Sequence, residues 1–196
     1  MSEGSGVERA RIVSPGGGAV IFTELDLKGA FLIQPERAED ERSFFARSWC
    51  TREFAAHWLN PALMQCNLSF NGRAGTVSGL HYQKAPHGEA KMVTCFQGAI
   101  YDVIVDLRSE SPTCRQWLAM ELTGENLLSL YIPEGFAHGF QTLKDQTLVF
   151  YQMSEFFDPP SAAGIRWDDA TLQITWPLPV SVISHRDRQL AKVANS

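Results

Sequence analysis

The sequence predicts an all-β fold, a β-sandwich or jelly roll made of many short strands. Runs rich in Val, Ile, Tyr and Phe recur along residues 91–157, and Gly or Pro separates them, as at Gly98 and Pro133. A helical pattern is found only in one patch before residue 60. At 196 residues with 44% hydrophobic composition, the chain is long enough to bury a complete core in one domain.

The N-terminal part is expected to differ from the rest. Residues 1–20 are rich in Ser, Pro and Gly and show little periodicity, so we expect a flexible extension there and a single domain over 21–196. A helix is predicted within 43–57, where aromatic residues give an amphipathic pattern. These aromatic residues are Phe44, Phe45, Trp49 and Phe54.

Strands are predicted through the middle of the chain. Residues 91–108 form two apolar runs separated by Gln97 and Gly98, which indicates a hairpin. Another strand over 127–132 ends at Pro133. Residues 147–157 alternate, which places four side chains on one face of a strand. These are Thr147, Val149, Tyr151 and Met153.

Composition excludes several classes of partner. The 17 Lys and Arg against 22 Asp and Glu give a net charge of −5, spread along the chain, so nucleic acid is not expected as a partner. No apolar run approaches the length of about 20 residues that crosses a bilayer, and the N-terminus lacks a signal-peptide core, so we expect a cytoplasmic protein with no membrane partner. The four cysteines form no CxxC pair and are expected to be reduced. They are Cys50, Cys66, Cys95 and Cys114.

Common nucleotide and nucleophile motifs are absent. The sequence contains neither GxGxxG nor GxxxxGK[ST], and it lacks GxSxG. These absences argue against a Rossmann enzyme, a P-loop NTPase and an α/β-hydrolase.

Two histidine segments are candidates for chemistry, GLHYQ at 79–83 and PEGFAHGF at 133–140. Each histidine also has a structural interpretation, as a buried imidazole satisfied by the backbone. A metal site would draw on His81, His87, Glu89 and His138. Gln83 stands where a His-x-His pair would place its second ligand, so the ligand pattern is incomplete and we expect no metal.

A proton-transfer site would need a base, an acid that orients it, a cation and a second acid. An imidazole ordinarily titrates near neutrality, so His81 can be the base, and Asp187 can fix its tautomer. Lys91 can stabilise an enolate oxygen and Tyr151 can return a proton. Each has a simpler alternative: Lys91 as a solvated strand start, Tyr151 as a core aromatic and Asp187 as a surface charge.

At these residues the sequence resembles the dTDP-4-dehydrorhamnose 3,5-epimerase family of cupins. The matching stretches follow the family order from about residue 23 to the C-terminus. They are DER at 40–42, QCN at 65–67, GLHYQ at 79–83, Lys91, YDVIVDLRSESPT at 101–113, PEGFAHGF at 133–140, Tyr151, GIRWDD at 164–169 and SHRD at 184–187.

The resemblance implies a cupin jelly roll with short peripheral helices, a homodimer, and no metal or organic cofactor. It implies that His81 removes a proton α to the C4 ketone with Asp187 as its partner, that Lys91 holds the enolate, and that Tyr151 protonates the opposite face. The substrate would be a 4-keto-6-deoxy sugar nucleotide, used for a surface polysaccharide or a glycosylated metabolite. Further residues match positions that contact this substrate: Arg42, Gln65, Asn67, His138 and Arg186.

Four positions depart from the family pattern, all in the expected binding shell. Ser78 replaces an arginine, Arg47 replaces a glutamate, Ala162 and Ala163 stand where a glutamate is lost, and Phe157 replaces a frequent tyrosine. An absent arginine contact costs about 1.5–3 kcal/mol of binding unless Arg47 or Arg73 replaces it. These departures leave alternatives open: a single-centre epimerase or a 3,4-ketoisomerase on another nucleotide sugar, or a non-catalytic sugar-nucleotide binder or metal-binding cupin.

Overall fold

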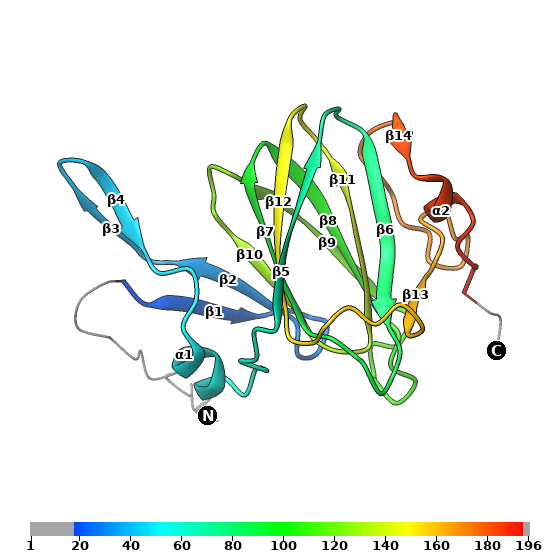
Figure 1. The fold of residues 1–196 in the computed structure, drawn as a ribbon, viewed down its shortest axis with the longest axis horizontal. Coiled ribbons are helices and arrows are strands. Elements are labelled where there is room, and N and C mark those ends of the chain that lie inside the picture. Colours follow the sequence, from blue (N-terminus) through cyan, green and yellow to red (C-terminus); the bar gives the residue numbers. More distant parts are fainter. Residues whose placement is uncertain (1–17, 194–196) are drawn as a thin grey trace, which may run out of the picture.

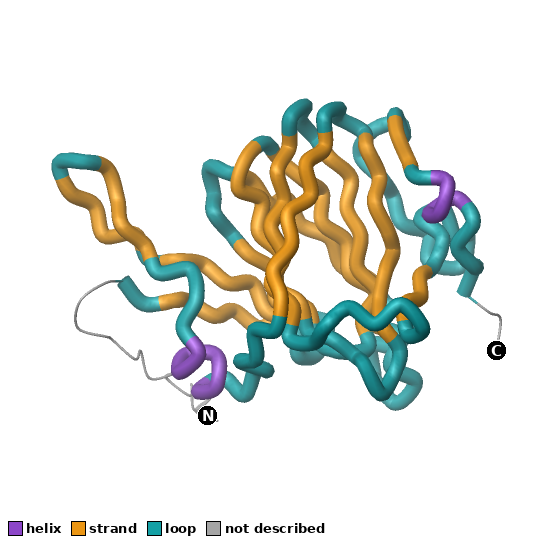
Figure 2. Tube along the Cα trace, in the orientation of Figure 1, coloured by secondary structure: helices purple, strands orange, loops and turns teal. Residues whose placement is uncertain are grey.

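Two facing β-sheets dominate the computed structural model, which describes residues 18–193 (Figures 1 and 2). The first sheet contains, in spatial order, β1 (Val20–Glu24), β2 (Phe31–Pro35), β10 (Ser129–Ile132), β7 (Lys91–Gln97), β12 (Thr147–Met153) and β5 (Gln65–Asn71). The second contains β13 (Ala162–Gly164), β6 (Thr76–Gln83), β11 (Phe136–Thr142), β8 (Ala99–Asp106) and β9 (Trp117–Thr123), with β14 (Val182–Ile183) parallel to β6. The predicted all-β jelly roll is confirmed.

The remaining elements are small. Strands β3 (Arg37–Asp40) and β4 (Ser43–Ala46) form a separate hairpin that projects from the body in Figure 1. The helices are α1 (Thr51–Ala56) and α2 (His185–Arg188). Within residues 18–193, no helix has both the length and the apolar character needed to span a membrane.

The main core lies between the two sheets because inward positions alternate along each strand. Ile100 and Ile104 of β8, for example, pack with Val93 of β7 and Val149 of β12. Asp102 occupies the inward position between the two isoleucines and is fully buried. The interior between the sheets thus combines apolar side chains with a buried carboxylate.

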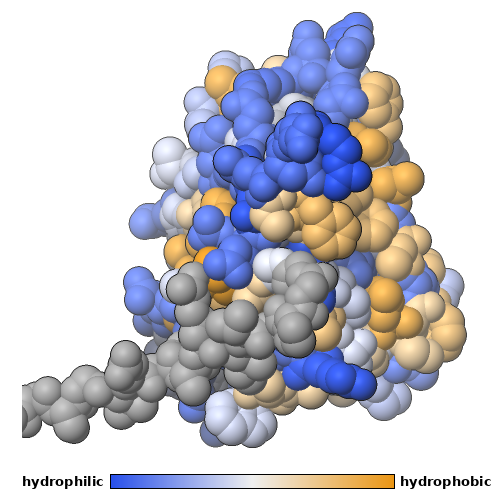
Figure 3. Space-filling view, turned by 90° about the vertical axis from the view of Figure 1, so that its left-hand side faces the viewer, coloured by the Kyte–Doolittle hydropathy of each residue, from blue (hydrophilic) through white to orange (hydrophobic). Residues whose placement is uncertain are grey.

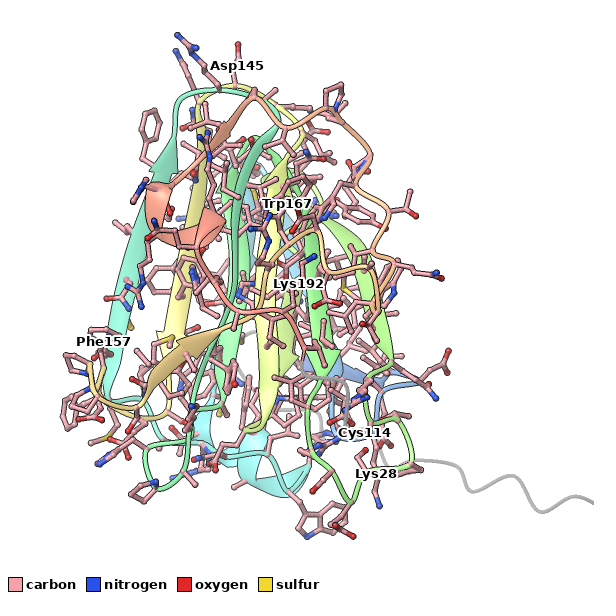
Figure 4. The ribbon with its side chains drawn as sticks, turned by 90° about the vertical axis from the view of Figure 1, so that its right-hand side faces the viewer. Lys28, Cys114, Asp145, Phe157, Trp167 and Lys192 are labelled. Atoms are coloured by element: carbon pink, nitrogen blue, oxygen red, sulfur yellow. The ribbon has the colours of Figure 1, made fainter. Side chains whose placement is uncertain are left out.

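A second apolar layer covers the outer face of the second sheet. The C-terminal segment crosses this face in Figure 4, where Trp167 and Lys192 are labelled. Leu80 and Val103 point outward from the sheet and pack against Ile165 and Leu172 of that segment. This packing holds the chain close to β6 as it leads into α2.

The helix predicted over 43–57 is wrong in its first part. Residues 43–46 form β4, and the helix begins only at Thr51. The ring of Phe44 lies under the guanidinium of Arg37, 4.7 Å away on the facing strand. Cross-strand contacts therefore override the helical spacing of the aromatic residues.

The hairpin predicted at Gln97 and Gly98 is also wrong. The two runs are the strands β7 and β8, but they belong to different sheets. Gly98 adopts φ +78 and forms the corner where the chain passes from one sheet to the other. Residues 1–17 of the predicted extension lie outside the described part of the chain.

Candidate functional site

Four strands bring the two histidine segments and the predicted acid and cation to one end of the jelly roll. His81 of β6 pairs with His138 of β11 in the second sheet. Lys91 of β7 and Tyr151 of β12 lie on neighbouring strands of the first sheet. Strand alternation points these side chains into the space between the sheets.

Helix α2 places Asp187 beside His81. Ser184 caps the helix by accepting a hydrogen bond from the Asp187 backbone N–H at 3.0 Å. The Asp187 carboxylate then lies 2.7 Å from His81 Nε2 and accepts the Gly79 backbone N–H at 3.2 Å. With Nε2–H donated to Asp187, His81 keeps its lone pair on Nδ1.

The charge of Asp187 is held in place by these contacts. Burial acts to raise the pKa of its carboxyl, but the hydrogen bond and charge of His81 and the Gly79 N–H outweigh it. The pKa of Asp187 therefore lies below its usual value. An ionised Asp187 favours the imidazolium that forms when His81 accepts a proton.

Lys91 is buried and makes two directed contacts. Its Nζ lies 2.8 Å from Glu89 Oε1, and both side chains are less than a tenth exposed, at 7% and 6%. The same Nζ donates to the backbone carbonyl of His81 at 3.2 Å. The cation is therefore fixed relative to the strand that carries His81.

Tyr151 stands across the interior from His81. Removal from water raises the pKa of its phenol far above the usual value, and the charge of nearby Asp102 acts in the same direction. A hydrogen bond with the Ser69 side chain offsets part of this shift. The phenol therefore stays protonated and can serve as an acid.

Two adjoining cavities open at this end of the protein and share His81, Asn67 and Met153. The first, of about 390 Å³, is lined by Gln65, Asn67, His81, Tyr82, Gln83, Glu89, Met153, Phe157, Ala162, Ala163 and Arg186. The second, of about 290 Å³, is lined by Asn67, Leu68, Ser69, Ser78, His81, Lys91, His138, Gly139, Phe140, Tyr151 and Met153. Phe157 lies at the edge of the molecule in Figure 4.

The cavities bring together all of the predicted site residues except Arg42, with Asp187 in contact through His81. Arg42 lies in the β3–β4 hairpin, where its side chain is 88% exposed and pairs with Asp40. It lines neither cavity. Within one chain Arg42 therefore lies apart from the cavities, and its contact with the substrate stays a prediction.

Of the positions that depart from the family pattern, some line the cavities and one does not. Ser78 lines the second cavity, and Phe157 and Ala162 line the first. Arg47 instead pairs with Glu53 at 3.3 Å. Neither Arg47 nor Arg73 is among the residues that line the cavities, so the hypothesis that one of them replaces the missing arginine has no support in this chain.

Sequence reasoning missed the partner of His138. Asp102 lies 2.7 Å from His138 Nε2, and its other oxygen, Oδ2, is buried without a hydrogen-bond partner among residues 18–193. An acidic residue between two inward isoleucines was the available signal, since a buried carboxylate requires a partner. From its residue type alone Glu89 is a candidate metal ligand. Its separation of two residues from Lys91 is a second signal, because side chains two residues apart lie on the same side of an extended segment.

The potential metal ligands do not converge. Among residues 18–193, no group of three or more His, Cys, Asp or Glu side chains is arranged to hold a metal ion. The backbone carbonyl of His87 accepts a hydrogen bond from the Gln83 side chain. It lines neither cavity.

Comparisons with known proteins agree with the residue pattern. The family model described as dTDP-4-dehydrorhamnose 3,5-epimerase matches residues 24–195. A dTDP-4-dehydrorhamnose 3,5-epimerase of Sinorhizobium fredii is 37% identical over 167 residues, which cover 85% of this chain and 86% of that protein. A dTDP-4-dehydrorhamnose 3-epimerase of Streptomyces niveus is 36% identical over 88% of this chain and 83% of its own.

A solved structure is also similar. The dTDP-4-dehydrorhamnose 3,5-epimerase of Bacillus anthracis, crystallised with TDP and pyrophosphate bound, superposes with a TM-score of 0.86 at 38% identity. The match covers 89% of this chain and 100% of that one. By sequence and by fold, this chain belongs to the dTDP-4-dehydrorhamnose 3,5-epimerase family.

Proposed function

We propose that this protein is a cofactor-independent epimerase that converts dTDP-4-keto-6-deoxyglucose to dTDP-4-dehydrorhamnose by inverting C3 and C5. The observation that carries the proposal is the paired His81 and Asp187 on the second sheet, facing Lys91 and Tyr151 on the first. This arrangement supplies a base, its orienting carboxylate, a cation and an acid around one cavity.

The first step is proton removal from a carbon next to the C4 ketone. His81 Nδ1 accepts the proton, and Asp187 holds the ring through Nε2 while the imidazolium forms. The electron pair left on carbon moves to the ketone oxygen and gives an enolate. The substrate's own ketone is thus the electron sink, and the reaction needs no organic cofactor.

The enolate is stabilised by Lys91. Its ammonium group is buried and already fixed by two contacts, so little reorganisation is needed when negative charge develops on the C4 oxygen. A cation placed in a site of low polarity stabilises this charge more strongly than one in water.

Inversion requires the new proton to arrive from the other side. His81 belongs to the second sheet and Tyr151 to the first, so the two groups approach a bound sugar from opposite faces. Burial keeps the Tyr151 phenol protonated. Tyr151 donates that proton to carbon and the ketone re-forms with the centre inverted.

The first cavity suits the nucleotide diphosphate. Gln65 and Asn67 offer amide donors, Arg186 offers a cation and Phe157 offers an aromatic face. Arg186 is the cation among the residues that line this cavity. Further positive charge is needed to bind a dianion.

A homodimer provides this charge, with the β3–β4 hairpin of a partner subunit delivering Arg42. The hairpin projects from the body and exposes Phe44 and Phe45, at 42% and 60%. Hydrophobic side chains are visible on this side of the molecule in Figure 3. Leu68 and Phe70 of the edge strand β5 are each 66% exposed, which gives a second apolar surface for a partner to cover.

Mixing two inactive variants tests this homodimer. Arg42→Ala and His81→Ala are each expected to lose activity, and exchange of subunits between them should restore part of it, because one site of each mixed dimer is intact. Absence of recovery in mixed dimers, purified through an affinity tag carried by one of the two variants, would exclude a shared site.

Isotope exchange tests the reaction itself. We expect the protein to incorporate deuterium at C3 and C5 of dTDP-4-keto-6-deoxyglucose in deuterated water, with the doubly inverted sugar as product. His81→Ala should abolish exchange at both carbons. No exchange in the wild-type protein would overturn the assignment to this dTDP sugar.

A second candidate function is supported by Ser78, which stands in the wall of the second cavity where the family has arginine. The altered wall fits a single-centre epimerase or a 3,4-ketoisomerase acting on another nucleotide sugar. NMR of the product distinguishes these outcomes, since one inverted centre or a 3-keto sugar replaces the doubly inverted product. A non-catalytic binder would bind dTDP without exchange, and a metal-binding cupin would show stoichiometric metal by elemental analysis.

We also infer that the protein works in the cytoplasm. All four cysteines are free thiols, and Cys95 is buried, where loss of water raises its thiol pKa to about 11. Unpaired thiols in a stable fold fit a reducing compartment. Fractionation of cells that carry the native gene would test the location.

A further inference from the structure

We propose that Glu89 is a positioning residue that aims the ammonium group of Lys91 at the C4 oxygen of the substrate. The proposal rests on the function proposed above. It starts from the buried ion pair between Glu89 Oε1 and Lys91 Nζ, 2.8 Å apart. No role in the proton transfers requires Glu89, yet its side chain is buried at the site and only 6% exposed.

The ammonium group of Lys91 can donate three hydrogen bonds in three fixed directions. A lysine ammonium group has three N–H bonds and no acceptor. One of them points to Glu89 at 2.8 Å and a second to the carbonyl oxygen of His81 at 3.2 Å. The tetrahedral geometry then fixes the direction of the third.

The residues that line the two cavities indicate where the third N–H of Lys91 points. Lys91 lines the cavity that also contains His81, His138 and Tyr151, whereas Glu89 lines the adjoining cavity. The ion pair therefore forms part of the wall between the two spaces, with the carboxylate on one side and the ammonium group on the other. The free N–H is directed into the cavity that holds the proposed base and acid.

Loss of Glu89 would release this restraint. Lysine has a flexible four-carbon stem, so an ammonium group with a single remaining contact samples several positions. A displacement of about 1 Å from the reacting atom can reduce a rate by about 100-fold. The effect belongs to the enolate, which exists only during the reaction, so it should appear in kcat rather than in nucleotide affinity.

Two variants separate orientation from charge. In Glu89→Gln the amide oxygen still accepts a hydrogen bond from Lys91, and we expect kcat within about threefold of the wild type. In Glu89→Ala that acceptor is lost, and we expect kcat to fall by about tenfold or more while the Kd for dTDP stays within about twofold. Glu134→Ala, at an exposed position that lines neither cavity, is the matched control.

A readout independent of turnover completes the test. In proton–nitrogen spectra of protein labelled at lysine Nζ, a restrained, ion-paired ammonium group gives a slowly exchanging signal. We expect a Lys91 signal, assigned by its loss in Lys91→Ala, in the wild type and Glu89→Gln, and its disappearance in Glu89→Ala. Thermal unfolding shows that each variant is folded.

The outcomes are distinguishable. If the wild type exchanges no isotope, the proposed function fails, but the Nζ spectra still decide whether Glu89 restrains Lys91. A Glu89→Ala variant that keeps both the wild-type kcat and the Lys91 signal would overturn the positioning role. Equal losses in kcat and in dTDP affinity would indicate a purely structural role and would also overturn it.

Discussion

Replacement of Asp187 by Asn tests the central contact of the site with little change in shape. The carboxylate lies 2.7 Å from His81 Nε2, and its side chain is only 6% exposed. The asparagine keeps the size of the side chain but removes its charge. The imidazolium that forms during proton removal then loses its counter-charge.

The size of the effect follows from that contact. A hydrogen bond to a charged partner contributes about 1.5–3 kcal/mol. Since about 1.36 kcal/mol corresponds to a tenfold change in rate, we expect proton abstraction to slow by about 10- to 150-fold. The loss is larger if the amide N–H₂ group donates to Nε2, because His81 Nδ1 would then carry the proton.

The assay is the rate of deuterium incorporation at C3 and C5, followed by NMR. The matched control is Asp168→Asn, whose carboxylate pairs with Arg166 at a partly exposed position outside the site. This control should keep the wild-type exchange rate, because an ion pair of this kind contributes about 1 kcal/mol or less to stability. Exchange within about twofold of the wild type in folded Asp187→Asn would refute the proposed orientation of His81.

Three further changes test other parts of the molecule. Tyr151→Phe should retain isotope exchange through His81 but block inversion, because the proton donor on the opposite face is removed; inverted product in NMR spectra at the wild-type rate would contradict the assignment. Gly79→Ala should lower the free energy of unfolding by about 1–3 kcal/mol or more in urea, since Gly79 has φ +113 and its added Cβ would lie 2.6 Å from Gly139 Cα, while Gly72→Ala, with nothing within 4 Å, should not. Burial acts to raise the pKa of Asp106, but hydrogen bonds from one guanidinium and two hydroxyl groups lower this pKa overall. The ionised carboxylate therefore stabilises the folded protein above its unfolded pKa of about 4, and this contribution is lost as the pH falls. The stability difference between the wild type and Asp106→Asn should therefore be greatest near neutral pH and narrow below about pH 4; a constant difference would argue against a charged Asp106.

The strand pattern and the motif order were sufficient to predict the jelly roll. Alternation in 147–157 correctly placed Tyr151 and Val149 on the same face as Met153. Which strands pair with one another was harder to predict from the sequence. Glycine occurs both in hairpin turns and where the chain passes from one sheet to the other, so it does not distinguish the two. Gly98 illustrates this ambiguity, which only the packing of the two sheets resolves.

For the candidate site too, some contacts could be predicted from the sequence and others could not. The contact between His81 and Asp187, 106 residues apart in sequence, is one possibility from the residues alone and is implied by the family resemblance, since no local spacing encodes it. The positions of Glu89 and Asp102 follow from the inward and outward alternation of short segments. The position of Arg42 within its own chain could not be predicted from the sequence, because a projecting hairpin carries it away from the two cavities.

The attachment of α2 has a consequence for how the protein loses activity. This single turn carries Asp187, and the strand pairing beside it is short: β14 pairs in parallel with Thr76 and Val77, and one bridge joins Ile165 and Ala191. Segments with so few backbone bonds open in local fluctuations that cost less free energy than global unfolding. Each opening separates the carboxylate from His81 while both sheets remain intact. Warming or mild denaturant should therefore abolish activity reversibly before the β-sheets unfold. The packing of one short segment would then set the temperature range in which the enzyme is active.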